Sequence, residues 1–186
     1  MKNKCLILIL FVSFLILFSC KKKEIIEPLP PNTETGQNTF IFRVNGGEII
    51  TSKVEYLSTS PRIHIYYSHI EPTYGSYFFG VDGGVLYLEE HKFVSIVVKS
   101  MTSIGKYLLS TENSSASYSD VKPVQLYYNT DANNTGELDI TKLDTTNHII
   151  SGSFKFNAKN SKNDDIVTID GQFDVKYKPN EGVNYY

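Results

Sequence analysis

Tryptophan and cysteine are the residue types that this chain most clearly lacks. Its 186 residues include no Trp and only two Cys, Cys5 and Cys20, both near the N-terminus. The chain after Cys20 therefore has no thiol to act as a nucleophile, a metal ligand or half of a disulfide. A body of roughly 150 residues can be stable without such crosslinks, because it buries about two-thirds of the surface exposed by its unfolded chain.

An excess of charge is also missing. The formal net charge is −2, and without Lys2 and Lys4 it is about −4. Nucleic acids are bound by clustered basic side chains, and this balance indicates no such surface. The sequence therefore predicts no nucleic-acid partner.

Long hydrophobic runs are absent apart from one at the N-terminus. Cys5–Phe18 is a run of 14 residues broken only by Ser13, and it follows Lys2 and Lys4. A membrane-spanning helix needs roughly 20 apolar residues, so this run is too short. A positive start followed by a short apolar run is typical of a signal peptide.

The four residues that end this run resemble a lipobox. Leu17-Phe18-Ser19-Cys20 places an aliphatic residue at −3 and a small residue at −1 before the cysteine. Only a thiol can accept the diacylglyceryl group, and the small residue fits a signal-peptidase pocket. Residues 1–19 are therefore predicted to be a lipoprotein signal peptide and Cys20 the lipidation site. A plain signal peptide with a chance cysteine, or a retained anchor, is the alternative.

Residues 20–37 are interpreted as the lipidated cysteine and a linker. Two acyl chains supply on the order of 20 kcal/mol of anchoring, so the membrane is the predicted partner of the N-terminus. The linker contains Pro28, Pro30 and Pro31, which favour an extended chain. Lys21–Lys23 stand where lipoproteins exported to the cell surface carry acidic residues, which favours the periplasmic face of the outer membrane.

Residues 38–186 are predicted to form a single all-β domain. Apolar and polar residues alternate with period two, and no stretch has helical periodicity over three turns. Asn45-Gly46-Gly47 and Asp82-Gly83-Gly84 are typical of tight turns between strands. About nine or ten short strands favour an antiparallel sandwich or a partly closed barrel. The expected strands are 39–44, 48–52, 62–67, 77–81, 85–90, 93–99, 124–129, 136–142, 150–158 and 167–177.

Four segments of this domain carry a resemblance. They are Thr39-Phe40-x-Phe42-x-Val44-Asn45-Gly46, Gly136-x-Leu138-x-Ile140-Thr141-Lys142-Leu143-Asp144, Ile149-Ile150-Ser151-Gly152-Ser153-Phe154-x-Phe156-x-Ala158 and Asp170-Gly171-x-Phe173-Asp174-Val175. Together they resemble an uncharacterised family of lipoproteins from Gram-negative bacteria, whose shared domain has no assigned function. The resemblance covers residues 38 to about 177. It implies an exported, lipidated, all-β protein, and it implies no activity or catalytic residue.

One polar stretch is a calcium candidate. Asp131, Asn133, Thr135 and Asp139 supply oxygen atoms at the spacing of a calcium-binding loop, with Gly136 at the expected sharp turn. The twelfth position is Lys142, where such a loop has a bidentate glutamate, and strands are expected on both sides. The alternative is a solvated hairpin turn in which Asn and Gly supply positive φ angles.

No catalytic residue and no cofactor is predicted. The four histidines lack metal-binding spacing, and there is no Gly-x-Ser-x-Gly elbow. The chain is therefore interpreted as a non-enzymatic lipoprotein of the cell envelope that presents an all-β surface to a protein or a small ligand. Two alternatives remain open: a glycan-binding accessory lipoprotein, whose 13 tyrosines could stack on sugar rings, and a barrel that binds a small apolar ligand.

Overall fold

The fold is known from a computed structural model, which describes most of the chain after residue 26. The described residues are 27–52, 63–70, 76–86, 91–110, 113–121, 124–179 and 184–185. The predicted signal peptide and Cys20 lie outside these ranges. Within them there is no helix, so none that could cross a membrane.

The described residues contain twelve strands, which pair antiparallel. This confirms the all-β prediction, with more strands than the nine or ten expected. Their bounds are β1 Thr39–Val44, β2 Ile50–Thr51, β3 Ile63–Ile70, β4 Ser76–Leu86, β5 His91–Val98, β6 Gly105–Leu109, β7 Ser114–Asp120, β8 Leu126–Asn129, β9 Gly136–Asp144, β10 Ile149–Asn160, β11 Ile166–Lys176 and β12 Asn184–Tyr185.

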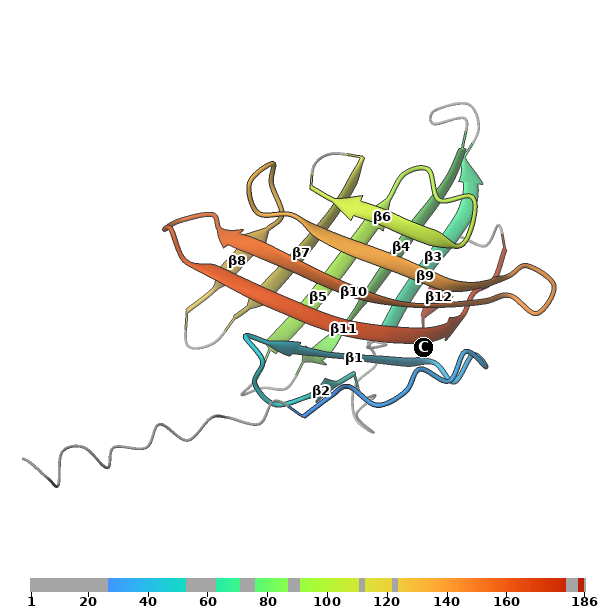
Figure 1. The fold of residues 1–186 in the computed structure, drawn as a ribbon, viewed down its shortest axis with the longest axis horizontal. Helices are drawn as coiled ribbons and strands as arrows, with labels where there is room; N and C mark the ends of the chain where they lie inside the picture. The colour runs from blue at the N-terminus through green and yellow to red at the C-terminus, as the bar shows by residue number, and fades with distance from the viewer. Residues whose placement is uncertain are drawn as a thin grey trace, which may run out of the picture.

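One sheet curls over on itself into a half-barrel (Figure 1). The strands β12-β3-β4-β5-β7-β8 form one layer, and β6-β9-β10-β11-β1-β2 form a second layer that crosses it. The layers join where the end of β10 pairs with β8, Lys159 opposite Asn129 and Asn160 opposite Tyr128. The earlier residues of β10 pair with β9. This one long strand therefore connects the two layers at the place where the sheet curls over.

Aromatic rings fill the space between the layers. Phe40 lies 5.4 Å from Phe154 and 6.4 Å from Phe173 between ring centroids, and Phe79 of the opposite layer lies 5.8 Å from Phe173. All four rings are buried. Burying a phenylalanine stabilises a fold by about 1.5–3 kcal/mol, so this cluster is a large share of what holds the two layers together.

One expected turn is wrong. Asp82-Gly83-Gly84 was predicted to separate two strands, but β4 continues through it. Neither glycine has a positive φ. A Cβ on Gly83 would lie 2.4 Å from the Phe40 ring, and one on Gly84 would lie 2.2 Å from the Lys92 carbonyl oxygen. These glycines are needed for close packing, which a search for turn residues cannot distinguish from a turn.

The other expected turn is confirmed. Asn45 and Gly46 have φ angles of 53° and 71°, which suits a tight turn, and β2 begins at Ile50 and pairs with β1. The two C-terminal strands also match, since β10 and β11 include the predicted ranges 150–158 and, but for its last residue, 167–177.

The folded part begins earlier than Asn38, the expected boundary. Asp174 of β11 is fully buried, and its carboxylate accepts hydrogen bonds from the Thr33 hydroxyl at 2.5 Å, the Gly36 amide at 2.8 Å and the Ser151 hydroxyl at 2.7 Å. The amides of Thr35 and Gln37 donate to the same group. The last residues of the predicted linker are therefore docked on the domain.

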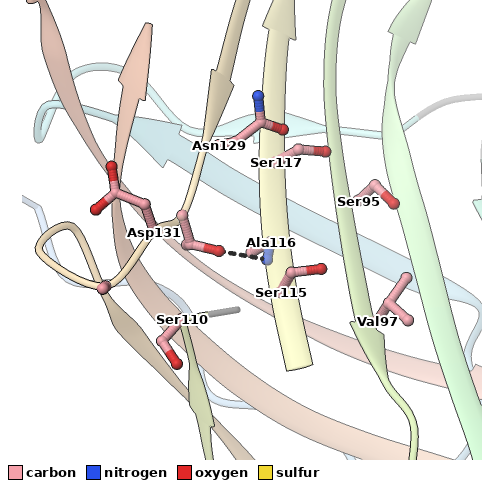
Figure 2. A pocket seen from close by; sticks show the side chains of 10 residues that line it. Ser95, Val97, Ser110, Ser115, Ala116, Ser117, Asn129 and Asp131 are labelled. Carbon is pink, nitrogen blue, oxygen red and sulfur yellow. Dashed lines mark hydrogen bonds between the residues drawn. The ribbon is translucent and has the colours of Figure 1, made fainter. Parts of the chain in front are cut away.

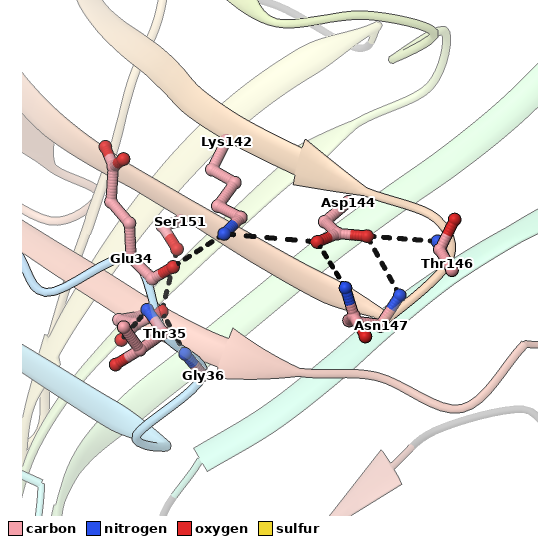
Figure 3. Close-up of polar contacts among 9 residues, drawn as sticks. Glu34, Thr35, Gly36, Lys142, Asp144, Thr146, Asn147 and Ser151 are labelled. Atoms are coloured by element: carbon pink, nitrogen blue, oxygen red, sulfur yellow. Dashed lines mark hydrogen bonds and ion pairs between the residues drawn. The ribbon is translucent and has the colours of Figure 1, made fainter.

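A second set of contacts extends this docking along the edge of the sheet (Figure 3). The Lys142 ammonium donates to the Glu34 carbonyl oxygen at 2.9 Å and lies 4.0 Å from Asp144. Further towards the N-terminus, the Gln172 side chain donates to the Pro30 carbonyl oxygen at 2.7 Å. The proline-rich segment is thus tied down by polar contacts, which hydrophobic alternation does not record.

Asp174 makes this docking dependent on pH. Burial raises its pKa, but the hydrogen bonds from Thr33, Ser151, Gly36 and Gln37 outweigh burial and lower the pKa to about 2. An acid whose folded pKa is depressed stabilises the fold above its unfolded pKa near 4, and the stabilisation is lost as the pH falls towards 2. The contribution is about 2 kcal/mol.

We expect Asp174→Asn to lower the free energy of unfolding at pH 7 by about 2–4 kcal/mol, because five donors then face a neutral amide. It should also flatten the loss of stability between pH 4 and pH 2. Urea unfolding followed by circular dichroism measures both effects. Asp164→Asn is the control, since Asp164 is 97% exposed and pairs only with Lys159. Equal unfolding curves for the two variants would contradict this role of Asp174.

Candidate binding sites

A row of polar side chains crosses the outer face of one layer. Alternate residues of β3, β4, β5, β7 and β8 are buried towards the rings, so their neighbours in sequence face outwards. The strand register places one outward polar residue of each strand beside the next. The row consists of His64, Asp82, Ser95, Ser117 and Asn129.

The middle of this row is hollowed into a pocket of about 580 Å³, here called the serine groove (Figure 2). β5, β7 and the end of β8 form its floor, and the loop after β8 forms one wall. That loop is held to β7, because the Ala116 amide donates to the Thr130 hydroxyl and the Thr130 amide donates to the Ala116 carbonyl oxygen. The lining residues are Ser95, Val97, Ser110, Ser115, Ala116, Ser117, Asn129, Thr130, Asp131 and Ala132.

The polar groups of the groove are open to a ligand. In the part of the chain that the structure describes, the side chains of Ser95, Ser115, Ser117 and Asn129 make no hydrogen bond to the protein. Their hydroxyl and amide groups both donate and accept. The groove therefore offers neutral hydrogen-bonding groups beside the carboxylate of Asp131.

Asp131 carries the charge at this site. The hydrogen bonds that it accepts within the loop after β8 give a structural reason for the calcium-like spacing. Its carboxylate accepts hydrogen bonds from the Asn134 amide and side chain and from the Asn133 amide, at 2.7–3.0 Å. These bonds lower the pKa of Asp131, those from Asn134 most. No described residue from Thr130 to Gly136 has a positive φ, so the expectation that Asn and Gly supply one is wrong.

The four calcium candidates are divided between loop and strand. Asp131 and Asn133 lie in the loop between β8 and β9. Thr135 lies at the end of this loop, and its carbonyl oxygen accepts a hydrogen bond from the Asn157 amide. Asp139 lies inside β9, opposite Lys106 and Ser153. Among the described residues, no three His, Cys, Asp or Glu side chains lie close enough to hold a metal ion. Calcium binding by this set remains a prediction.

A second pocket, here called the tyrosine pocket, opens at one end of the half-barrel with a volume of about 470 Å³. Tyr67 and Tyr177 are buried, and Tyr77 is 40% exposed. The rings of Tyr67 and Tyr77 stack with centroids 5.2 Å apart and planes 17° apart. The remaining lining residues are Ser68, Thr145, His148 and Pro179.

Burial determines the protonation state of the two buried tyrosines in the tyrosine pocket. Burial raises the pKa of Tyr67 to about 12 and also raises that of Tyr177, so both hydroxyls keep their protons at neutral pH. His148 has a φ of 56°, and its ring lies 5.3 Å from that of Tyr177. Its Nδ1 atom is buried and has no hydrogen-bond partner among the described residues, which is rare for a buried polar atom.

A family described as a domain of unknown function, DUF6252, matches residues 87–176. This range includes the whole serine groove and Asp174, and all of the tyrosine pocket's β9–β10 turn. No curated protein and no solved structure matches the chain. The match therefore supports a domain of unknown function and brings no activity with it.

The strand at the centre of the serine groove was not predicted from the sequence. β7 reads Ser-Ser-Ala-Ser-Tyr-Ser-Asp, with only Ala116 and Tyr118 facing inwards. Inward and outward residues alternate along β7, as in any strand with one buried face. Its outward residues are serines, which are common in turns and loops, so the segment was not predicted as a strand. The regular spacing of Ser115, Ser117 and Ser119 around Ala116 and Tyr118 indicates a strand, although the segment has few large apolar residues.

The turn at Asp131 can be tested against the calcium interpretation. We expect Asp131→Ala to lower the melting temperature equally with and without 5 mM CaCl₂, because the carboxylate is engaged by Asn133 and Asn134. Differential scanning calorimetry of both proteins, with EDTA as the reference, measures this. If calcium stabilises the wild type and not Asp131→Ala, the loop binds the ion.

Proposed function

We propose that this chain is a non-enzymatic, lipid-anchored binding protein of the cell envelope, with the tyrosine pocket as a ligand site. The observation that carries the proposal is the exposed Tyr77 ring, stacked on buried Tyr67 at the mouth of an open pocket. Ligand pockets combine aromatic walls with a few well-placed polar groups, and Ser68, Thr145 and His148 provide those groups here.

The absence of a catalytic set among the described residues supports binding over catalysis. Among the described residues, Asp131 accepts hydrogen bonds from Asn133 and Asn134 and not from a histidine, and His148 has no hydrogen-bond partner at Nδ1. A nucleophile needs a base within hydrogen-bond reach, and that base needs its own orienting group. Recognition requires neither.

The docked N-terminal segment supports close attachment to a membrane. If Cys20 carries the lipid, residues 21–26 alone separate it from the first described residue, Glu27, whose carbonyl oxygen accepts from the Arg43 side chain. Six residues span at most about 20 Å. We infer a domain held near the headgroups on the periplasmic face of the outer membrane, with Lys21–Lys23 against anionic lipid.

Of the alternative ligands, a sugar ring is favoured by the shape of the pocket. A pyranose can pack its C–H face against the exposed part of the Tyr77 ring while its hydroxyls meet His148, Ser68 and Thr145. An apolar ligand inside the barrel is disfavoured, since Phe40, Phe154 and Phe173 already occupy that interior. The glycan-binding reading is therefore the second candidate.

Cys20→Ser tests the anchor. We expect it to abolish incorporation of an alkyne-tagged fatty acid and to release the protein from the membrane fraction, because no other thiol follows the leader. Click labelling and carbonate-washed membrane fractionation measure both effects, with Cys5→Ser as the matched control that should change neither. A labelled, sedimenting Cys20→Ser protein would contradict lipidation at this position.

Tyr77→Ala tests the pocket. We expect saturation-transfer NMR with a panel of methyl glycosides to give signals for the full chain, and Tyr77→Ala to weaken them at least tenfold through lost stacking. Leu108→Ala is the matched control, because Leu108 is an exposed apolar residue, at 65%, and lines neither the tyrosine pocket nor the serine groove. Equal signals from both variants would show that the pocket is not the ligand site.

A further inference from the structure

The serine groove is a second site that the proposed ligand pocket leaves unused. It lies on the outer face of the sheet, whereas Tyr67 and Tyr177 are buried on the inner side at one end. The polar row inside the groove, Ser95, Ser117 and Asn129, crosses three strands that lie about 4.8 Å apart, which is roughly 10 Å. Beyond the groove the row continues through Asp82 and His64 to a length of roughly 19 Å. A row of that length matches an extended chain better than a compact ligand.

The chemistry of the groove selects a neutral chain. Its lining contains no lysine or arginine, and Asp131, its one ionisable group, keeps its negative charge at neutral pH. Lys159, the register partner of Asn129, also acts on Asp131, but its ammonium is paired with Asp164 at 2.7 Å. A polyanion, including a nucleic acid or an acidic polysaccharide, would therefore be repelled by the Asp131 carboxylate. The hydroxyls of Ser95, Ser115 and Ser117 and the amide of Asn129 instead suit a partner that both donates and accepts.

A peptide strand is a poorer occupant. Extended peptides are held by main-chain hydrogen bonds at the edge of a sheet. The groove lies on a face, where β5 and β8 already pair with β7 through their backbones and only side chains remain available.

Aromatic rings lie beside the polar row. In the adjacent row Phe93, Ser119 and Tyr127 are register partners, and Tyr127 is 44% exposed. Val97 adds an apolar surface to the floor of the groove. Rings and apolar surface beside hydroxyls and an amide match the two faces of a sugar, whose C–H groups pack and whose hydroxyls bond.

We propose that the serine groove binds a neutral polysaccharide chain that lies across β5, β7 and β8. Ser95, Ser117 and Asn129 hydrogen-bond successive sugar hydroxyls, and Tyr127 stacks on one sugar ring. Many membrane-anchored copies along one polysaccharide would raise the apparent affinity through avidity. This site goes beyond the proposed function, because it is distinct from the tyrosine pocket and does not require it.

Affinity electrophoresis tests the groove. The full chain, extracted from membranes in neutral detergent, is run in native gels that contain hydroxyethyl cellulose, galactomannan or dextran, or polygalacturonate as the anionic probe. We expect at least one neutral polysaccharide to slow migration and polygalacturonate not to do so. No retardation by any neutral polymer, or equal retardation by polygalacturonate, overturns the proposal.

Paired variants locate the site. Ser117→Leu fills the groove and removes a hydroxyl, and Asn129→Ala removes the amide from an exposed position. Each should weaken retardation at least fivefold. Ser153→Leu is the matched control, since Ser153 is an exposed serine on a strand of the other layer. If Ser117→Leu lowers the melting temperature, its weaker retardation could come from misfolding, and the retardation of Asn129→Ala then decides whether the groove is the site.

Wild-type retardation by Asn129→Ala overturns the site, as does equal weakening by Ser153→Leu. Tyr77→Ala should migrate as the wild type does in these gels. If the wild-type chain gives no glycoside signal but is still retarded in the gels, the tyrosine pocket alone is overturned. If it gives the glycoside signal but no retardation, the groove alone is overturned.

Discussion

Closure of the half-barrel depends on one contact, the ring of Phe40 against the backbone of Gly83. Phe40 lies on β1 and Gly83 on β4, so the contact joins the two layers. Any side chain at Gly83 would occupy the place of the ring, and Phe40 is in turn packed against Phe42, Phe154 and Phe173. Because the interior is filled in this way, positions for a ligand arise at the end of the half-barrel and on its outer face.

Asp174 connects the fold to the proposed attachment. A buried carboxylate is stable only where hydrogen bonds compensate for its lost hydration, and here the donors come largely from residues 33–37. Residues 33–37 are therefore fixed in direction on the domain. A fixed exit point and a short remaining tether would hold the domain in a restricted orientation, so that the same face meets the envelope in every copy.

The two pockets differ in a way that suits different parts of one kind of ligand. The tyrosine pocket is an end site with buried hydroxyls and an exposed ring, and the serine groove is a shallow face lined with small polar groups. A single ring fits the former and a chain fits the latter.

The sequence by itself determined the strand class, the β1–β2 turn and the paired strands β10 and β11, because alternation and turn residues are local properties. It predicted Asp131 as a polar loop residue but not the groove beside it. Only the tertiary structure decided that Gly83 is a packing position, that residues 33–37 are docked, and that β7 lies between β5 and β8. Each of these depends on a residue distant in sequence: Phe40 for Gly83, Asp174 for the linker, and Ser95 and Asn129 for Ser117. Local patterns cannot carry that information, since burial and register arise only when separate strands meet.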